Sequence, residues 1–313
     1  MEGGYLIIYK INKKKRIFQS KLKVNCSFSA IFMVIITNKT QLSGILDDYR
    51  QKGKVIGFVP TMGALHEGHL SLLKKSIENS DVSVCSIFVN PTQFNDKADL
   101  ERYPRMPEKD AHMLEKAGCN ILFLPEVKEI YPEQDKRVFH FGNLDKILDG
   151  AHRPGHFNGV AQVVSILFDI VKPDKAFFGE KDYQQLLIIK DLTQQLKLKI
   201  EVIGCPIFRE ADGLAMSSRN MLLSDEERKA ASLIPVLMQE AKKLKNEGKS
   251  IGEIKQFVSN KLASNPLYKL DYYEICNAAT LEPLSSLNNT PKSISLIAVF
   301  VGKIRLIDNL ALD

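Results

Sequence analysis

The amino-acid sequence predicts an α/β protein in which a doubly wound parallel sheet is followed by a smaller α+β domain. Apolar, β-rich runs alternate with helical patterns between residues 33 and 209, and short connections join them. This alternation favours a parallel sheet with helices on both faces. After about Arg209 the pattern changes to helices followed by three strands, which indicates a second domain over residues 210–313.

The strands of the first domain are predicted from short apolar runs. Met33 opens MVIITNKTQLSGILDDYRQKGKVIGFVP, a stretch typical of a strand, a helix and a second strand. Buried strands are predicted over residues 55–60, 82–89, 120–125, 175–180 and 200–207.

Helical patterns occupy the intervals between these strands. After Gly68, the residues Leu70, Leu73 and Ile77 recur at helical spacing, with charged residues on the other side. Further helices are predicted over residues 108–117 (ending at Gly118), 159–171 (stopped by Pro173) and 182–196.

The C-terminal domain begins with a predicted single long helix over residues 224–244. Ser224 is suited to cap it, and acidic residues fill its first turn. A shorter helix is predicted near residues 251–263. The last three apolar runs, LDYYEICNA, SISLIAVFVG and KIRLIDNLAL, predict a small antiparallel sheet.

Composition argues against several classes of protein. No stretch approaches the ~18 apolar residues of a membrane helix. The net charge is +6, but residues 1–32 hold seven of the 43 basic side chains and one of the 37 acidic ones, so the remaining chain is neutral. A neutral body argues against a nucleic-acid groove. The five cysteines are scattered and lack a CxxC pair, which indicates a reducing compartment and no disulfide framework or zinc site.

Residues 1–32 differ from the rest of the chain, because they are basic and have no clear amphipathic period. They lack the apolar core and cleavage site of a signal peptide, while their composition leaves a transit peptide open. We favour a native start at Met33, with residues 1–32 as an extension outside the fold. An intact mass matching a start at Met1, with these residues protected from protease, would contradict this hypothesis.

Four polar clusters follow predicted strands of the parallel sheet. They are PTMGALHEGH, FVNPTQF, GEKDYQQ and READGLAMSSRN. The carboxyl ends of parallel strands meet at one edge of the sheet, where open α/β folds bind their ligands. Four loops at one edge can converge on a single ligand, and this convergence indicates a binding site more strongly than any one motif.

The HEGH cluster places His66 and His69 three residues apart. Zinc-binding histidines on a helix normally lie four apart, and no third ligand is obvious in this loop, so a metal site is disfavoured. A packed pair of histidines at a helix start is a second interpretation. Phosphate binding fits best, because free N–H groups and the helix dipole attract an anion where the loop becomes a helix near Gly68. Two imidazoles can then donate hydrogen bonds as charge builds.

Two other clusters complement this site. Ser217, Ser218 and Arg219 supply hydroxyls and a guanidinium suited to phosphate. Lys181 follows a strand, from where its ammonium can reach a triphosphate, and Asp182 can accept hydrogen bonds from ribose hydroxyls. Either cluster alone would be an ordinary polar loop, but together with HEGH they favour ATP.

These residues carry a resemblance. HEGH resembles the HIGH signature of class I aminoacyl-tRNA synthetases and nucleotidylyltransferases, and MSSRN stands where their KMSKS loop lies. Within that superfamily the sequence is most similar to the pantothenate synthetase (pantoate–β-alanine ligase) family. The matching motifs cover essentially all of residues 33–313 and are PTMGALHEGH (60–69), FVNPTQF (88–94), YPR (103–105), HRPGHFNGV (152–160), FGEKDYQQL (178–186), READGLAMSSRN (209–220) and VGKIRLIDN (301–309).

The resemblance implies a Rossmann-like domain of nucleotidylyltransferase type over residues 33–209 and a domain over 210–313 that closes over the active site. It implies a ligase of pantothenate biosynthesis that uses ATP with Mg²⁺. The carboxylate of pantoate would attack the α-phosphate to give pantoyl adenylate and pyrophosphate, and the amine of β-alanine would then displace AMP. A cytoplasmic homodimer is also implied, without a nucleic-acid or membrane partner.

The resemblance also implies roles for individual residues. His69, His66 and Lys181 would be catalytic, and Gln93 and Gln185 would hold pantoate, with Gln93 also near β-alanine. Contacts with ATP are implied for Met62, Gly63, Ala64, Leu65, His66, Glu67, Gly68, His69, Gly179, Glu180, Lys181, Asp182, Phe208, Met216, Ser217, Ser218 and Arg219. The family usually has valine where this chain has Phe208, so we expect a reshaped adenine pocket unless that contact is made by the backbone.

Three other functions compete with this one. Another nucleotidylyltransferase, such as a cytidylyltransferase or a nicotinamide mononucleotide adenylyltransferase, would share the HxGH region but lack the second domain and the FVNPTQF and GEKDYQQ loops. A tRNA synthetase needs an anticodon-binding module and a basic face. A non-catalytic nucleotide-binding regulator should have lost polar residues that this chain keeps. Pantoate-dependent exchange between ATP and pyrophosphate separates all four.

Overall fold

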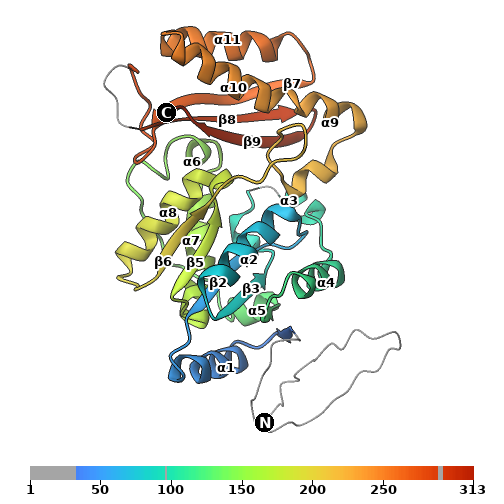
Figure 1. Ribbon diagram of the computed structural model, residues 1–313, viewed down its shortest axis with the longest axis vertical. Helices are drawn as coiled ribbons and strands as arrows, with labels where there is room; N and C mark the ends of the chain where they lie inside the picture. The colour runs from blue at the N-terminus through green and yellow to red at the C-terminus, as the bar shows by residue number, and fades with distance from the viewer. Residues whose placement is uncertain (1–32, 96, 288–291) are drawn as a thin grey trace.

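The structure is a computed structural model that describes residues 33–95, 97–287 and 292–313. A six-stranded sheet with helices forms one part, and a three-stranded sheet covered by helices α10 (Leu233–Asn246) and α11 (Ile251–Ala263) forms the other (Figure 1). The hypothesis about residues 1–32 lies outside the described residues. In the described part of the chain, no helix is long and apolar enough to cross a membrane.

The large sheet confirms the predicted parallel α/β fold. All its pairings are parallel, in the order β1-β4-β3-β2-β5-β6. Each predicted strand is present, although most are shorter than the apolar run that predicted them. The strands are β1 (Val34–Ile36), β2 (Ile56–Thr61), β3 (Val82–Ile87), β4 (Ile121–Phe123), β5 (Lys175–Gly179) and β6 (Glu201–Cys205).

Helices cover both faces of this sheet, which explains why its strands are apolar on both sides. Strand residues such as Phe58 and Phe123 share a core with one group of helices, and Val59 and Phe177 share a second core with the other. The first group is α1 (Lys39–Gln51), α7 (His156–Val171) and α8 (Tyr183–Gln195), and the second is α2 (Glu67–Asn79) and α4 (Pro107–Lys116).

The strand order reverses direction between β2 and β5. From β2 the chain builds outward through β3 and β4, and from β5 it builds the other way through β6. In open α/β sheets, ligands bind beyond the carboxyl ends of the strands at such a point. The polar clusters that follow β2 and β5 therefore flank the expected binding crevice.

The C-terminal part differs from the prediction in one element. Residues 224–244 form two helices, α9 (Asp225–Ala231) and α10 (Leu233–Asn246), so the prediction of one long helix was wrong. Pro235 explains the break, because it has no N–H to donate to the Ala231 carbonyl and its ring clashes with that oxygen. Ser224 does cap α9, in a capping box with Glu227.

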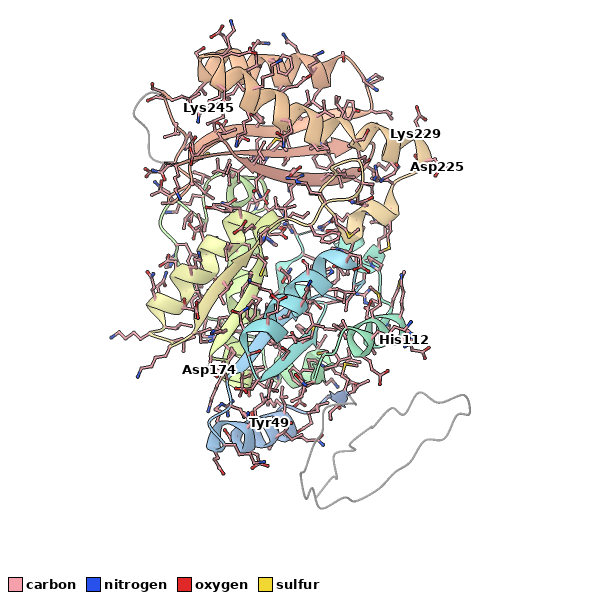
Figure 2. The ribbon with its side chains drawn as sticks, viewed as in Figure 1. Tyr49, His112, Asp174, Asp225, Lys229 and Lys245 are labelled. Atoms are coloured by element: carbon pink, nitrogen blue, oxygen red, sulfur yellow. The ribbon has the colours of Figure 1, made fainter. Side chains whose placement is uncertain are left out.

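The remaining C-terminal elements follow the prediction. Helix α11 spans Ile251–Ala263, and β7 (Tyr268–Asn277), β8 (Ser293–Val301) and β9 (Ile304–Ala311) pair in antiparallel order. On α10, Lys245 Nζ donates to the Leu312 carbonyl at 2.8 Å, which ties this helix to the end of the chain (Figure 2).

Short elements without a strong pattern were not predicted from the sequence. They are η1 (Pro91–Gln93), α3 (Lys97–Arg102), α5 (Val127–Ile130), α6 (Asp149–His152), η2 (Glu180–Asp182) and η3 (Ser218–Leu222).

The motif VGKIRLIDN joins the small sheet to the large one. Arg305 Nη2 donates to Asp149 at 2.6 Å. The Asp308 carboxylate accepts hydrogen bonds from both terminal nitrogens of the Arg209 guanidinium, at 2.7 and 2.9 Å. Asn309 also donates to backbone carbonyls of η2. Together these bonds fix the small sheet over the carboxyl edge of the large one, which is the edge that carries the polar clusters.

Candidate active site

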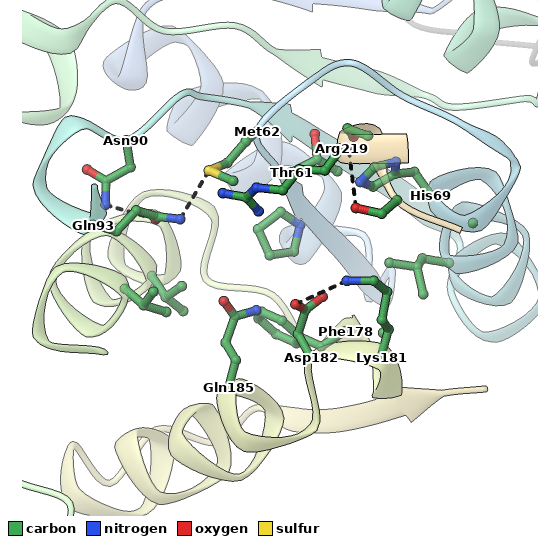
Figure 3. A pocket seen from close by; sticks show the side chains of 18 of the residues that line it. Thr61, Met62, His69, Asn90, Gln93, Phe178, Lys181, Asp182, Gln185 and Arg219 are labelled. Carbon is green, nitrogen blue, oxygen red and sulfur yellow. Dashed lines mark hydrogen bonds and ion pairs between the residues drawn. The ribbon is translucent and has the colours of Figure 1, made fainter. Parts of the chain in front are cut away.

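A cavity of about 240 Å³ lies at the carboxyl edge of the large sheet. Figure 3 shows polar side chains from several loops pointing into it, with Gln93 opposite His69 and Lys181. The loops after β2, β3, β5 and β6 all contribute to its wall, so the predicted convergence of four clusters is present. The predicted site residues that line it are Met62, His66, Gly68, His69, Gln93, Gly179, Lys181, Asp182, Gln185, Phe208, Met216, Ser217, Ser218 and Arg219.

Five predicted ATP contacts do not line this cavity: Gly63, Ala64, Leu65, Glu67 and Glu180. Ala64 and Leu65 are almost fully buried, at 1% and 3% exposure, and therefore contribute to the shape of the loop and not to its surface. Gly63 and Ala64 have positive φ angles of 83° and 50°, which turn the chain sharply between β2 and α2.

The two histidines form the N-terminal cap of α2. His66 is the N-cap, and its Nδ1 accepts the Gly68 N–H at 3.2 Å, while Nδ1 of His69 accepts the His66 N–H at 3.3 Å. Because each Nδ1 acts as an acceptor, the ring proton of each neutral imidazole must lie on Nε2. Both histidines line the cavity, with their ring centroids 4.1 Å apart.

The two imidazoles are neutral near pH 7. Burial, together with the nearby Lys181 ammonium, lowers the pKa of His66 to about 4. Burial lowers the pKa of His69 to about 3, assisted by His66 and Lys181. The pair can therefore donate hydrogen bonds from Nε2 without carrying charge.

Lys181 lies on the short helix η2 that follows β5. Its ammonium is 3.7 Å from a carboxylate oxygen of Asp182. The backbone of η2 is held from the small sheet, because Asn309 Nδ2 donates to the carbonyl oxygens of Glu180 and Lys181 at 2.8 and 2.9 Å. The lysine backbone is thus fixed while its side chain reaches into the cavity (Figure 3).

The segment Ser217–Arg219 closes another side of the cavity. The Ser217 hydroxyl accepts the Arg219 N–H at 3.2 Å, and the Ser218 hydroxyl donates to the Ala64 carbonyl at 3.0 Å. Arg219 is paired with Asp99 on α3 at 3.0 Å. Ser218 therefore joins this segment to the loop after β2, and Arg219 must leave or share its acidic partner to bind an anion.

The amide side chains predicted for pantoate lie across the cavity. Gln93 is 8% exposed; its Nε2 donates to the Met62 sulfur at 3.0 Å, and its Oε1 accepts from Asn90 at 3.1 Å. Gln185 projects from α8 toward the same space (Figure 3). The apolar wall beside them includes Val160 and Phe178.

Several lining residues were not predicted as site residues. Arg153 and His156 belong to the motif HRPGHFNGV, Asn90 to FVNPTQF and Tyr103 to YPR, so the sequence did contain a signal for each. His156 donates from Nδ1 to the Gln93 carbonyl at 2.8 Å and accepts from Arg153 at Nε2 at 3.1 Å. Burial lowers the pKa of His156 to about 4, so this histidine is a neutral link between Arg153 and the loop of Gln93.

Phe208 lines the cavity and is 40% exposed, which is high for so large an apolar side chain. Its Cβ lies 3.7 Å from the position that a Cβ on Gly68 would occupy, so this side chain begins beside the start of α2. This is a position from which the ring can contact a bound base.

Comparison with known proteins identifies relatives over nearly the whole described chain. The sequence model of the family described as pantoate-beta-alanine ligase matches residues 34–311. A pantothenate synthetase of Porphyromonas gingivalis is 45% identical over 278 residues, which cover 89% of this chain and 99% of that protein. A pantothenate synthetase of Phocaeicola vulgatus is 47% identical over 280 residues, with coverage of 89% and 99%.

Solved structures give the same result. The crystal structure of pantothenate synthetase from Thermus thermophilus superposes with a TM-score of 0.83 at 40% identity, over 89% of this chain and 99% of that one. The Francisella tularensis pantoate-beta-alanine ligase complexed with β-γ ATP and β-alanine gives a TM-score of 0.76 at 36% identity, over 90% and 98% of the two chains. The chain therefore belongs to the pantoate–β-alanine ligase family, whose members are also called pantothenate synthetases.

Proposed function

We propose that the cavity at the carboxyl edge of the large sheet is the site where this ligase condenses pantoate with β-alanine, at the expense of ATP. One observation carries the assignment of the site. The histidine pair after β2, Lys181 after β5 and the segment Ser217–Arg219 line one cavity, at the point where the strand order reverses. This combination of donors and cations suits a triphosphate next to a small-molecule pocket.

The reaction has two displacement steps. In the first, a carboxylate oxygen of pantoate forms a bond to the α-phosphorus of ATP, and the bond to the bridging oxygen breaks to release pyrophosphate. In the second, the β-alanine nitrogen bonds to the acyl carbon, the acyl–oxygen bond breaks to release AMP, and the amine loses a proton. A carboxylate and a free amine are already nucleophiles, so the first step needs positioning and charge stabilisation more than a strong base.

The histidine pair would act on the α-phosphate as neutral donors. Since Nδ1 of each ring is engaged in capping α2, the Nε2–H groups of His66 and His69 are left to bind phosphate oxygens. The positive charge would come instead from Lys181 and Arg219. Hydrogen bonds and positive charge from three separate loops would therefore stabilise the attacked phosphate.

Pantoate would bind between the two glutamines. Amide groups of Gln93 and Gln185 can bond both the hydroxyl and the carboxylate oxygens of a hydroxy acid. The apolar wall that contains Val160 and Phe178 suits the two methyl groups of pantoate. We propose that β-alanine enters next to Gln93, and that the partly buried Arg153 attracts one of the carboxylates.

Mg²⁺ would enter with the nucleotide. The described residues contain no group of three or more His, Cys, Asp or Glu side chains that could hold a metal ion. Asp182 is the one carboxylate among the described residues that line the cavity. Mg²⁺ commonly uses one or two carboxylates together with substrate phosphates, so this donor set fits an ion that ATP carries.

Three broader features belong to the same proposal. Residues 33–209 would form the ATP- and pantoate-binding domain, and residues 210–313 a domain that closes over the site. The enzyme would be a cytoplasmic homodimer without nucleic-acid or membrane partners. Sedimentation at micromolar concentration tests the dimer, and a monomer mass would contradict it.

The function is tested by exchange of labelled pyrophosphate into ATP. We expect exchange that depends on pantoate, and pantothenate formation once β-alanine is added. Lys181→Ala serves as the matched control for a contaminating activity, because it removes a cation from the proposed site. Absence of exchange with pantoate, or equal exchange without it, would overturn the proposal.

A further inference from the structure

Asp110 is a buried carboxylate that does not line the cavity. It lies in the first turns of α4 and is 1% exposed. Its Oδ2 accepts the Ala64 N–H at 2.8 Å, and its Oδ1 accepts the Leu65 N–H at 2.8 Å. Both oxygens of a buried acid are thus used on two consecutive backbone groups of the loop that precedes the histidine pair.

The loop adopts a shape that the backbone does not hold by itself. Ala64 has a left-handed φ angle of 50°, which is uncommon for a residue with a Cβ. The N–H groups of Ala64 and Leu65 lie in the protein interior between β2 and α2, where an unpaired donor would be costly. Gly63 allows the carboxylate to approach, because a Cβ there would lie 3.2 Å from Asp110 Oδ2.

Ala64 is also held from the side opposite to Asp110. The Ala64 carbonyl accepts a hydrogen bond from the Ser218 hydroxyl at 3.0 Å, and Ser218 itself is 7% exposed. Ala64 is therefore fixed by α4 through its N–H and by the segment Ser217–Arg219 through its carbonyl. Buried hydrogen bonds therefore join this loop to α4 and to the segment Ser217–Arg219, and the histidine pair follows the loop directly in the chain.

We propose that Asp110 is a positioning residue for adenylate formation, which sets the location of His66 and His69 relative to Lys181 and Arg219 without touching substrate. The inference rests on the proposed function of the cavity. Burial raises the pKa of Asp110, while its bonds to Leu65 and Ala64 oppose that rise. A carboxylate is suited to this position because it can accept at both oxygens at once, whereas an amide of the same shape can accept at only one.

The test compares two aspartate-to-asparagine changes at opposite ends of β2. Asp110→Asn leaves one acceptor and turns an NH₂ group against a backbone N–H in the loop after the strand. The matched control is Asp174→Asn: Asp174 Oδ2 accepts the Ile56 N–H at 2.7 Å at the start of the strand, whereas the cavity lies beyond its other end; Figure 2 labels Asp174. Asp174 is more exposed than Asp110, so the melting temperature of each variant is measured beside its rate.

We expect Asp110→Asn to lower kcat for pantoate-dependent ATP–pyrophosphate exchange about 10- to 100-fold, since small misplacements of catalytic groups cost rates of this order. The KM for pantoate should change less than kcat, because Gln93 and Gln185 lie on η1 and α8, and Gln93 contacts this loop at Met62, ahead of the two residues that Asp110 holds. Asp174→Asn should keep its exchange rate at a temperature where it is folded. A purely structural role would lower the melting temperature of both variants and leave the exchange rate of the folded fraction unchanged.

Exchange by Asp110→Asn within twofold of wild type would overturn the inference, as would an equal loss in Asp174→Asn. If the wild type shows no pantoate-dependent exchange, the proposed function fails instead. A measurement on the unaltered protein covers the case in which Asp110→Asn does not fold. The amides of Ala64 and Leu65 should then exchange with deuterium as slowly as those of the buried strand β2, and fast exchange at both would contradict the proposed bonds.

Discussion

Replacing His69 by asparagine should separate its two functions. The imidazole accepts the His66 N–H at Nδ1, which caps α2, and leaves Nε2–H facing the cavity. In asparagine, Oδ1 is attached to Cγ as Nδ1 is, so the cap can be kept while the Nε2 donor is lost. Alanine removes both groups and serves as the matched comparison.

The expected magnitudes differ for the two functions. Loss of one donor to a developing charge costs about 10²–10³ in rate, or roughly 2.7–4 kcal/mol. The capping bond is neutral and 3.3 Å long, so its net contribution to the free energy of unfolding is about 0.5–1 kcal/mol. His69→Asn should therefore lose the full rate factor with little loss of stability, whereas His69→Ala should lose both.

The assay is pantoate-dependent ATP–pyrophosphate exchange, paired with urea unfolding of each variant. Near-normal exchange by folded His69→Asn would refute the Nε2 donor. Equal stability of the asparagine and alanine variants would refute the Nδ1 cap. The lowered pKa values add a third readout. The unfolded chain binds more protons than the folded one between about pH 3 and pH 6.5, so the stability present above pH 6.5 should fall as the pH is lowered. His69→Asn should reduce this dependence.

Three further predictions concern the other loops. Lys181→Ala should lower exchange by at least about 10², because the cavity loses a cation beside the phosphates, while the urea midpoint stays near that of wild type. Asn309→Ala should lower kcat more than it raises the KM for ATP, since the η2 carbonyls lose their donor but Lys181 remains; the matched control is Ser295→Ala, which removes a partly buried bond to the Leu310 carbonyl within the small sheet. Asp99→Asn should lower the KM for ATP, as Arg219 no longer has to leave an acid.

Each of these has a clear contradicting outcome. Unchanged exchange by Lys181→Ala would contradict a role for this lysine in adenylate formation. Equal kinetic losses in Asn309→Ala and Ser295→Ala would show that any weakening of the small sheet is enough, and that the bonds to η2 are not special. A higher KM for ATP in Asp99→Asn would mean that the acid orients Arg219 for binding, and does not compete with the nucleotide.

The parts of the fold that could be predicted are those with a strong apolar pattern. Strands such as β3 and the long helix α7 have apolar patterns that indicate their structure from the local sequence alone. Pro235 indicated a break between α9 and α10, but the continuous helical pattern on both sides of it led to the prediction of one helix. Short elements such as α6 could not be predicted, because one turn has no period and depends on tertiary contacts.

The candidate site was predicted where a side chain is polar and follows a strand. Lys181 and the histidine pair are in that class, and the cavity contains all three. The burial of Ala64 and Leu65 could not be predicted, because a contiguous motif does not show which of its residues face inward. Asp110 gave no signal either, since an acid in the first turn of a helix is ordinary in any sequence.

The histidines and the cations have different requirements, and the structure satisfies them in different ways. A neutral imidazole donor must point in one direction. Nδ1 of His66 and of His69 therefore accepts a backbone N–H at the start of α2, and the loop before them is bonded to the buried carboxylate of Asp110. A cation acts over a longer range and tolerates movement. The charged groups of Lys181 and Arg219 accordingly end long side chains, and their acidic neighbours Asp182 and Asp99 are 3.7 and 3.0 Å away. If the histidines carried the charge, their burial next to Lys181 would be unfavourable; as neutral donors they can be desolvated, which would strengthen each hydrogen bond that we propose to the α-phosphate.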